Sequence, residues 1–353
     1  MGTKGQHTLT EITTQPAAWA DALQAFESNQ QNVKGAWASL KPRQVLFTGC
    51  GSTHYLSQIA AALFQELTGV LARACPASEI ILFAPQVLSD PQHTLLVTIS
   101  RSGTTTETLQ ATSRFRQLGG QAVWGITCYP ESPVGQQTDL TLLAQAAQEQ
   151  SIAQTRSFAS MLVLAQALAA TVAGQQTAPL AALPDRGASL LEQTASLAES
   201  LGRRADLDRF FFLGSGWRYG LANEAMLKMK EMTLSHSEAF HFLEFRHGPQ
   251  SMINTRSLVI GLLSHEAHVH ERRVVDEMAA LGAQTLTLGP ASAASDASQH
   301  ISFDDQLPAW TTPVLYLPPL QLLAYHRAVG KGLDPDNPRN LQAVVFLDPA
   351  AFD

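Results

Sequence analysis

Small hydroxyl side chains gather at the end of one apolar segment, where they could bind an anion. Residues 95–99 are largely apolar and partly β-branched, which is typical of a strand covered on both faces. The next seven positions hold five hydroxyls, which are Ser100, Ser102, Thr104, Thr105 and Thr106. Backbone N–H groups at a helix start lack internal partners and favour an anion, and Gly103 adds room for close approach. Helix capping explains one or two such residues, whereas five favour a phosphate group.

The glycine pairs elsewhere in the chain do not form a complete nucleotide motif. Gly49-x-Gly51 and Gly214-x-Gly216 lack the third glycine of the dinucleotide fingerprint, and no suitably placed acidic residue follows. The Walker pattern GxxxxGK[ST] is absent. We therefore expect the anion to be part of a small substrate.

Three ionisable residues share one face of a predicted helix. Glu224, Lys228 and Glu231 are spaced by four and three residues, which brings their side chains together. A carboxylate that is partly removed from water has a raised pKa and can act as a general base. The usual alternative for such a glutamate is a solvated salt bridge.

Histidine and glutamate residues between 236 and 247 could also suggest a metal site. Their spacing fits no standard zinc pattern, and Pro249 predicts an irregular loop. The histidine-rich residues 265–273 also miss the HExxH spacing and predict an exposed loop and helix start. We expect neither a metal nor any other cofactor.

The elements that position these residues follow a repeated plan. Residues 44–69 and 209–233 each consist of an apolar strand, a glycine pair and a helical pattern, which indicates a duplicated unit. Further strands are predicted, alternating with helices, at residues 79–85, 94–100, 121–128, 140–146, 257–264, 284–290 and 312–318. This alternation predicts an α/β fold of two domains, each a doubly wound parallel sheet flanked by helices. In such sheets ligands bind outside the carboxyl ends of the strands.

The domain organisation follows from this plan. We predict an N-terminal helical segment at residues 1–28, a phosphate-binding domain at 29–180 and a catalytic domain at 190–353. The linker 173–187 is rich in Gly, Pro and Ala and leads into a helix at about 186–204.

Composition excludes several classes of protein. The 353 residues are 45% hydrophobic and 15% charged, with a net charge of −7, so we expect no nucleic-acid partner. Three scattered cysteines are too few for a disulfide framework. No apolar run approaches membrane-spanning length, and the polar start shows no signal peptide. These features predict a cytoplasmic protein without membrane association.

Several motifs together resemble the tandem SIS (sugar isomerase) domain family. They are FTGCGSTHYLS, SRSGTTTETL, IAQTRSF, NEAMLKMKEMTLSHSEAF, EFRHGPQSMI and DPDNPRNL, in this order from about residue 25 onwards. The resemblance includes the isomerase half of glucosamine-6-phosphate synthase, SIS-type glucosamine-6-phosphate deaminases and related ketose/aldose isomerases. It implies a homodimer that binds a sugar phosphate and shares its active sites between subunits.

The resemblance also implies roles for individual residues in the first domain. The segment from Ser100 through Arg101 and Ser102 to Thr105 matches the phosphate loop of the family, where Arg101 replaces the usual Gln and could add a contact to the anion. Ser52 and Thr53 match a loop that borders the sugar. Ile152 and Gln154 match a segment that lines it.

In the second domain the resemblance implies the catalytic groups. Glu231 matches the base that moves a proton between C1 and C2 of an open-chain sugar, with Glu224 and Lys228 as its neighbours. His247 matches the residue that opens the sugar ring, acting in the site of the partner subunit. A histidine with a near-neutral pKa suits this proton transfer.

One departure from the family pattern affects the predicted reaction. Two positions after Leu341 the family has a lysine that can form a Schiff base with a ketose, whereas this chain has Ala343. Lys331 in the same region is an untested substitute. Gly2 follows Met1 where the synthase has its glutaminase cysteine, so we expect no glutamine-dependent synthesis.

The sequence therefore predicts conversion of a hexosamine 6-phosphate to a ketose 6-phosphate and ammonia, because such a substrate brings its own nitrogen. A non-deaminating ketose/aldose isomerase and a sugar-phosphate-binding regulator are the alternatives.

Overall fold

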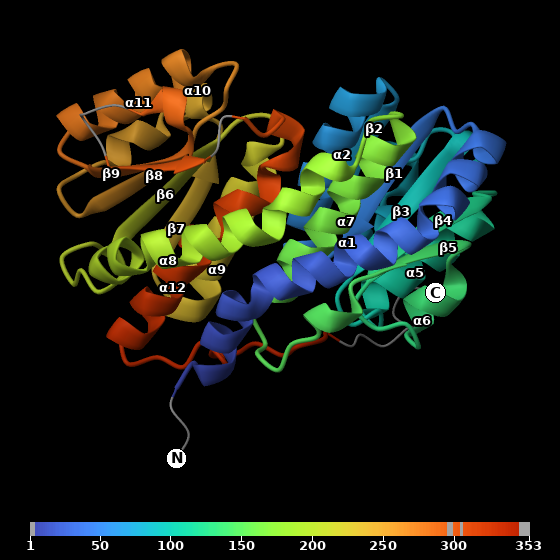
Figure 1. The fold of residues 1–353 in the computed structure, drawn as a ribbon, viewed down its shortest axis with the longest axis horizontal. Coiled ribbons are helices and arrows are strands. Elements are labelled where there is room, and N and C mark those ends of the chain that lie inside the picture. The colour runs from blue at the N-terminus through green and yellow to red at the C-terminus, as the bar shows by residue number, and fades with distance from the viewer. Residues whose placement is uncertain (1–3, 295–298, 304–305, 346–353) are drawn as a thin grey trace. The chain divides into compact units, whose positions relative to one another are not determined.

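The computed structural model describes residues 4–294, 299–303 and 306–345 (Figure 1). Residues 1–3, which include Gly2, lie outside this part. The chain divides into two compact units. We call Thr14–Glu149, Gln154–Pro184 and Gln342–Asp353 the first-sheet unit, and Met1–Thr13, Gln150–Ala153 and Asp185–Leu341 the second-sheet unit. The predicted boundaries at 29–180 and 190–353 stay a prediction.

The first-sheet unit contains five parallel strands in the order β2-β1-β3-β4-β5. The strands are β1 (Gln44–Gly49), β2 (Leu71–Pro76), β3 (Thr94–Ser100), β4 (Ala122–Thr127) and β5 (Leu140–Leu143). The helices are α2 (Ser52–Thr68), α3 (Ala77–Leu82), α4 (Ala84–Val87), α5 (Thr106–Gln117), α6 (Pro133–Gln137) and α7 (Arg156–Val172). The long helix α1 (Gln6–Leu40) begins in the second-sheet unit.

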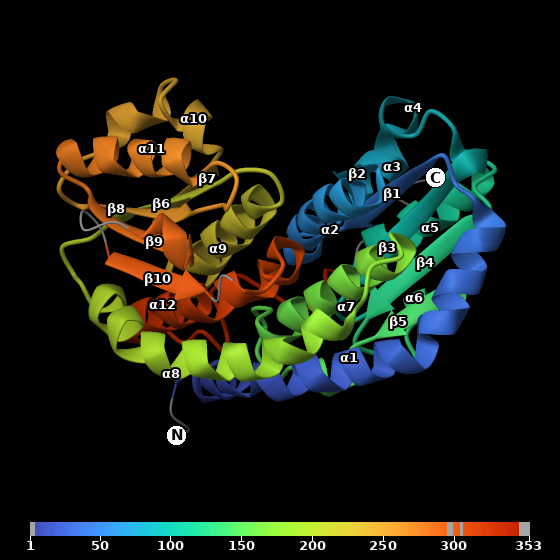
Figure 2. The same cartoon turned by 45° about the horizontal axis from the view of Figure 1, so that its top comes forward.

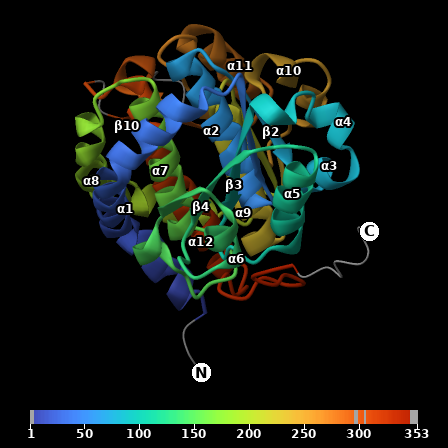
Figure 3. The same ribbon diagram turned by 90° about the vertical axis from the view of Figure 1, so that its right-hand side faces the viewer.

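Both faces of the first sheet are covered by helices, which explains why its central strands β1, β3 and β4 are buried throughout. Leu46, Leu96 and Val123 pack with residues of α3 and α5 on one face. On the other face Phe47 meets Phe64 of α2, with ring centroids 5.8 Å apart. Figure 3 shows α7 on one side of these strands, and α3 and α5 on the other.

The second-sheet unit repeats this architecture. Its strands are β6 (Arg209–Gly214), β7 (His236–Phe240), β8 (Ser257–Leu262), β9 (Gln284–Pro290) and β10 (Gln299–Phe303). They are parallel, in the order β10-β9-β8-β6-β7. Read from β7 to β10, this is the arrangement of the first sheet, with β6 in the place of β1, β7 of β2, β8 of β3, β9 of β4 and β10 of β5. The helices are α9 (Arg218–Thr233), α10 (Phe242–Phe245), α11 (His268–Ala280) and α12 (Leu317–Gly330), with α8 (Leu183–Gly202) leading into the unit. Figure 2 shows α10 and α11 on one face of the sheet. The predicted duplication and fold class are confirmed.

Two predicted strands are wrong. Residues 79–85 lie in α3 and α4, where Ile80 is fully buried while Leu82 and Phe83 are exposed, so the apolar run is one-sided as in a surface helix. Residues 312–318 form a 3₁₀ turn and the start of α12. Their prolines cannot donate to a ladder but are tolerated in a first helical turn.

The strands that complete the sheets were not predicted. These are β2, whose polar and apolar mixture suits a sheet edge, and β7 and β10, which occupy the outer positions of the second sheet. Helix α8 agrees with the predicted helix, and α1 extends well beyond the predicted segment 1–28. Within the described residues no helix combines the length and apolarity needed to span a membrane.

Candidate functional site

The predicted phosphate loop lies at the switch point of the first sheet. Strands β1 and β3 are neighbours, but the chain leaves β1 for β2 on one side and β3 for β4 on the other. Their following loops therefore diverge at the carboxyl edge, which is where doubly wound sheets bind their ligands. Ser52 and Thr53 follow β1, and Ser100 to Thr105 follow β3. The topology thus brings both predicted loops to one edge of one unit.

Local hydrogen bonds shape the loop after β3. The Ser100 hydroxyl accepts from the Gly103 amide at 3.0 Å and lies 3.5 Å from the Thr105 hydroxyl. Ser102 accepts from the amide and the hydroxyl of Thr104, at 3.2 and 3.0 Å. Thr105 precedes α5 but makes no side-chain capping bond to it. The hydroxyls therefore form a compact turn in front of α5. Because Thr105 does not cap this helix, its first backbone N–H groups suit an anion.

Gly103 is required by its backbone and by one neighbour. Its φ of 64° is in the left-handed region, and a Cβ there would lie 2.0 Å from the Ser132 hydroxyl oxygen. The close approach that we predicted for a ligand is thus made, in the structure, by Ser132.

The loop after β1 uses one of its two hydroxyls internally. Thr53 Oγ1 donates to the Cys50 carbonyl and accepts from the Cys50 amide, both at 2.9 Å. Ser52 is buried in the first turn of α2. Of the two predicted sugar contacts, Thr53 therefore has a structural role in its own loop.

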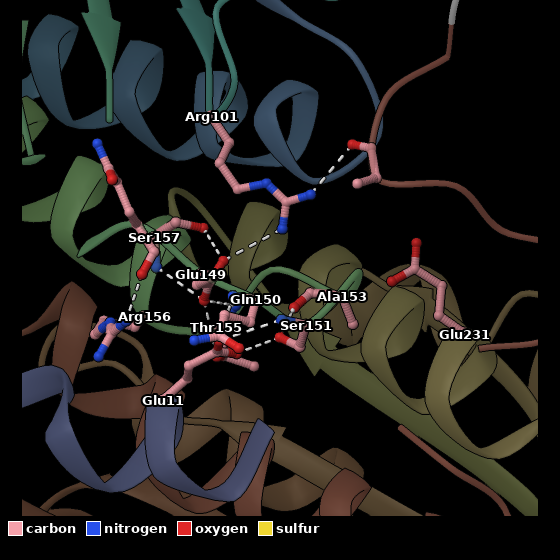
Figure 4. Close-up of polar contacts among 12 residues, drawn as sticks. Glu11, Arg101, Glu149, Gln150, Ser151, Ala153, Thr155, Arg156, Ser157 and Glu231 are labelled. Atoms are coloured by element: carbon pink, nitrogen blue, oxygen red, sulfur yellow. Dashed lines mark hydrogen bonds and ion pairs between the residues drawn. The ribbon is translucent and has the colours of Figure 1, made fainter. Parts of the chain in front are cut away.

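The Arg101 side chain reaches toward a buried carboxylate (Figure 4). Its Nη1 lies 3.3 Å from Glu149 Oε2, and its Nη2 donates to the Ala343 carbonyl at 3.1 Å. The Glu149 side chain is 0% exposed. It also accepts from Thr155 and Ser157 at the start of α7. Sequence reasoning missed Glu149, although its position just before the IAQTRSF motif was a usable signal.

The predicted sugar-lining residues lie in different units. Gln154, in the first-sheet unit, has a buried Oε1 with no hydrogen-bond partner among the described residues. Ile152, in the second-sheet unit, donates its amide to the Asp336 carbonyl at 3.1 Å. The intervening segment is fixed by Glu11, whose carboxylate accepts from the Gln150 and Ser151 amides at 2.6 and 3.2 Å.

The predicted acid–base cluster forms as the helical spacing requires. On α9 the Lys228 ammonium lies 3.5 Å from Glu224 Oε1 and 2.5 Å from Glu231 Oε2. Glu224 and Lys228 are almost fully buried, whereas the Glu231 side chain is 20% exposed. One ammonium thus balances two carboxylates, of which only Glu231 reaches the surface.

Glu231 also lines a small cavity in the second-sheet unit. The cavity has a volume of about 110 Å³ and is bordered by the loop 333–339, including Asp334, Asn337 and Arg339. This volume would hold a few water molecules or part of a small substrate. The helix residues and the DPDNPRNL motif are therefore neighbours in space.

His247 lies in an exposed turn after α10. Its amide donates to the Glu244 carbonyl at 2.9 Å, and the preceding Arg246 pairs with Glu277 at 2.7 and 2.8 Å. Gly248, with a φ of 125°, and Pro249 continue the turn. The imidazole of His247 is thus presented outward from a turn that Arg246 holds in place.

In the structure the side chain of Lys331 binds the carboxyl end of α9. Its ammonium donates to the Thr233 carbonyl at 2.6 Å and lies 3.4 Å from both the Leu234 carbonyl and the Ser235 hydroxyl. Burial, reinforced by Arg327, lowers the pKa of Lys331. It therefore caps the carboxyl end of α9, where a cation is favourable.

The described residues contain no cluster of three or more His, Cys, Asp or Glu side chains that could hold a metal ion. His241 from the suspected histidine stretch instead stacks on Tyr219, with ring centroids 3.9 Å apart.

Comparisons with known proteins agree with this architecture. The model of the SIS domain family matches residues 40–171 and 205–305. Glutamine–fructose-6-phosphate aminotransferase [isomerizing] from Methanothermobacter thermautotrophicus is 30% identical over 351 residues, covering 96% of this chain and 57% of that protein. The chain thus spans less than three-fifths of this relative.

Among solved structures, glucosamine-6-phosphate deaminase from Thermotoga maritima is 28% identical, covers 97% of this chain and 100% of its own, and has a TM-score of 0.83. Tagatose-6-phosphate ketose/aldose isomerase from Escherichia coli is 23% identical, covers 96% of each chain and has a TM-score of 0.85. The latter likeness shows the fold alone.

Proposed function

Because this chain belongs to the SIS domain family, we propose that it is a phosphosugar aldose–ketose isomerase and deaminase. Its substrate would be a hexosamine 6-phosphate, and its products a ketose 6-phosphate and ammonia. The observation that carries the proposal is the cluster on α9, where a partly exposed Glu231 shares the Lys228 ammonium with buried Glu224. The similarity to a glucosamine-6-phosphate deaminase over nearly the whole chain supports the amino-sugar substrate.

The hydroxyl loop after β3 would bind the substrate phosphate. Ser100, Ser102 and Thr105 supply hydroxyls beside the start of α5, and Ser52 follows the neighbouring strand. Binding energy from the phosphate, remote from the reacting carbons, can hold the open-chain sugar in place.

Glu231 would carry the proton transfer. As a base it removes the proton from C2 of the open-chain aldehyde and returns a proton to C1, while the C1 oxygen gains a proton and the C2 amino group loses one. These transfers leave a hydroxymethyl group at C1 and an imine at C2. Water then adds to C2 and ammonia leaves, so that hexosamine 6-phosphate plus water gives ketose 6-phosphate plus ammonia. The Lys228 ammonium holds Glu231 in position and balances its charge.

The nitrogen chemistry needs no lysine from the protein. The C2 amino group of the substrate becomes the imine nitrogen itself, which is compatible with Ala343 in place of the family lysine. Lys331 can remain in its capping position.

His247 would open the sugar ring in the site of a partner subunit. Its side chain is exposed on its own chain, so a second copy could receive it. A two-fold dimer would then contain two such sites.

The proposal is tested by an assay of ammonia release from 6-phosphates of glucosamine, mannosamine and galactosamine. Interconversion of the corresponding hexose and ketose 6-phosphates is measured in parallel. We expect ammonia and ketose 6-phosphate in equal amounts from at least one amino sugar.

Interconversion of neutral sugars without ammonia would instead identify an isomerase. Tight binding of a sugar phosphate with neither reaction would identify a binding protein, and would contradict the catalytic role of Glu231.

A further inference from the structure

A buried ion pair connects the phosphate loop to two other segments of the first-sheet unit. We propose that Arg101 and Glu149 are positioning residues, which hold the sugar-lining segment 154–157 and the segment around Ala343 in register with this loop. Arg101 then supports phosphate binding through Glu149 and not as a direct ligand. This inference rests on the proposed function.

Glu149 fixes the start of α7. Its Oε1 accepts from the Thr155 amide at 2.8 Å, the Thr155 hydroxyl at 2.9 Å and the Ser157 amide at 3.1 Å. The Ser157 hydroxyl donates to Oε2. Thr155 makes no side-chain capping bond to α7, so this carboxylate takes over the task of an N-cap.

Arg101 brings the phosphate loop to this carboxylate. Its backbone is fixed, because its carbonyl accepts from the Cys128 amide and the Thr127 hydroxyl, both at 3.2 Å. From this fixed position the guanidinium lies 3.3 Å from Glu149 and donates to Ala343 (Figure 4). A planar guanidinium with several donors can serve two such partners at once, which the Gln common in the family cannot do as well.

Burial makes this pair sensitive to the loss of one partner. The Arg101 and Glu149 side chains are 8% and 0% exposed. A buried carboxylate that loses its cation keeps its charge without compensation, so its other contacts rearrange. Those contacts hold the segment that carries Gln154, and we therefore expect Arg101 to affect the sugar-lining segment and the phosphate loop together.

Amide hydrogen exchange of Thr155 and Ser157 tests the structural part without any ligand. We expect Glu149→Gln to raise their exchange rates about 10- to 100-fold, since a charge-assisted hydrogen bond is lost. Arg101→Gln should raise them about 3- to 10-fold, and Arg101→Lys by less. Arg116→Gln is the matched control, because Arg116 pairs with Asp139 on the surface of the same unit. Unchanged exchange in Arg101→Gln would overturn the proposal.

A double-mutant cycle with inorganic phosphate tests the functional part. Calorimetry should show phosphate binding about 10-fold weaker in Arg101→Gln than in the wild type, and no further weakening when Arg101→Gln is added to Glu149→Gln. Equal losses in both backgrounds would mean that Arg101 binds the anion directly, and would overturn the proposal. If Glu149→Gln alone fails to fold, the exchange rates of Thr155 and Ser157 in Arg101→Gln still decide the proposal.

The two readouts separate this inference from the proposed function. If the wild type binds neither inorganic phosphate nor glucosamine 6-phosphate, the proposed function fails and the coupling to binding fails with it. The exchange rates still decide whether the pair holds the segment.

Discussion

At the scale of single residues, phosphate binding depends on the serine and threonine side chains of the loop after β3. We expect Ser102→Ala combined with Thr105→Ala to weaken binding of glucosamine 6-phosphate by about 3–6 kcal/mol, because two hydrogen bonds to a charged group are lost. Calorimetry checks this value, with Thr13→Ala on the exposed face of α1 as the control. Unchanged affinity would contradict the assignment of the loop.

Lys228 is the residue whose loss should cost most stability. Lys228→Met leaves two carboxylates on α9 without their shared cation, and we expect the free energy of unfolding to fall by about 3–5 kcal/mol. Urea unfolding measures the change, and Lys230→Met on the exposed side of the same helix should change it by less than about 0.5 kcal/mol. Equal effects of the two variants would contradict the buried cluster.

His54 should make the protein sensitive to mild acid. Burial lowers the pKa of His54 below its ordinary value of 6.5, partly offset by the Cys75 carbonyl. Below about pH 6.5 the unfolded state therefore binds more protons than the folded state, so stability is lost as the pH falls through the lowered pKa. The free energy of unfolding should drop less between about pH 7.5 and pH 5.5 in His54→Gln than in the wild type or in the exposed His270→Gln. An identical drop in all three proteins would contradict this.

At the scale of elements, Gly103 connects β3 to α5 in a conformation that other residues resist. In Gly103→Ala the alanine must adopt a left-handed φ, and its Cβ would lie 2.0 Å from the Ser132 hydroxyl oxygen. We therefore expect the free energy of unfolding to fall by about 2–4 kcal/mol. Gly69→Ala is the matched control, since Gly69 has a φ of 69° but open space around it, and should lose only about 1–2 kcal/mol. Equal losses would show that contact with Ser132 is unimportant.

The strand–loop–helix units were predictable because their signals are local. An apolar run, hydroxyls around a glycine and a helical pattern follow one another in the sequence, and they predicted β3, its loop and α5. The spacings of four and three residues predicted the cluster on α9. Residues 79–85 and 312–318 were assigned wrongly because an apolar run has no period that separates strand from helix. The family resemblance and the fold class are confirmed.

Contacts distant in sequence were beyond prediction. Glu149 pairs with Arg101, 48 residues earlier in the chain, and Asp336 accepts from Thr8 at the start of α1, 328 residues away. Glu149 lies just before the IAQTRSF motif and Asp336 lies within DPDNPRNL, but a motif does not say which distant residue its side chains will contact. The same holds for β7 and β10, whose polar residues become strands only because β6 and β9 lie beside them.

At the scale of the whole molecule, the proposed dimer makes a distinct prediction. Glu231→Gln and His247→Ala dimers should each be inactive, and mixing them should restore part of the activity after subunit exchange. Each heterodimer would contain one site with both groups intact, as two-fold symmetry requires. Ammonia release measures recovery, with labelled subunits to confirm exchange. Confirmed exchange without recovery would mean that both groups come from one chain.

The central claim is that Glu231 moves the proton between C2 and C1. The most direct measurement is the rate of ammonia release by Glu231→Gln at saturating hexosamine 6-phosphate, with substrate affinity determined on the same protein. We predict a rate lower by about 10²–10⁴-fold with affinity nearly unchanged, since the shape remains but the base is gone. Glu199→Gln, on the surface of α8, serves as the control. A Glu231→Gln protein that releases ammonia at the wild-type rate would contradict the account.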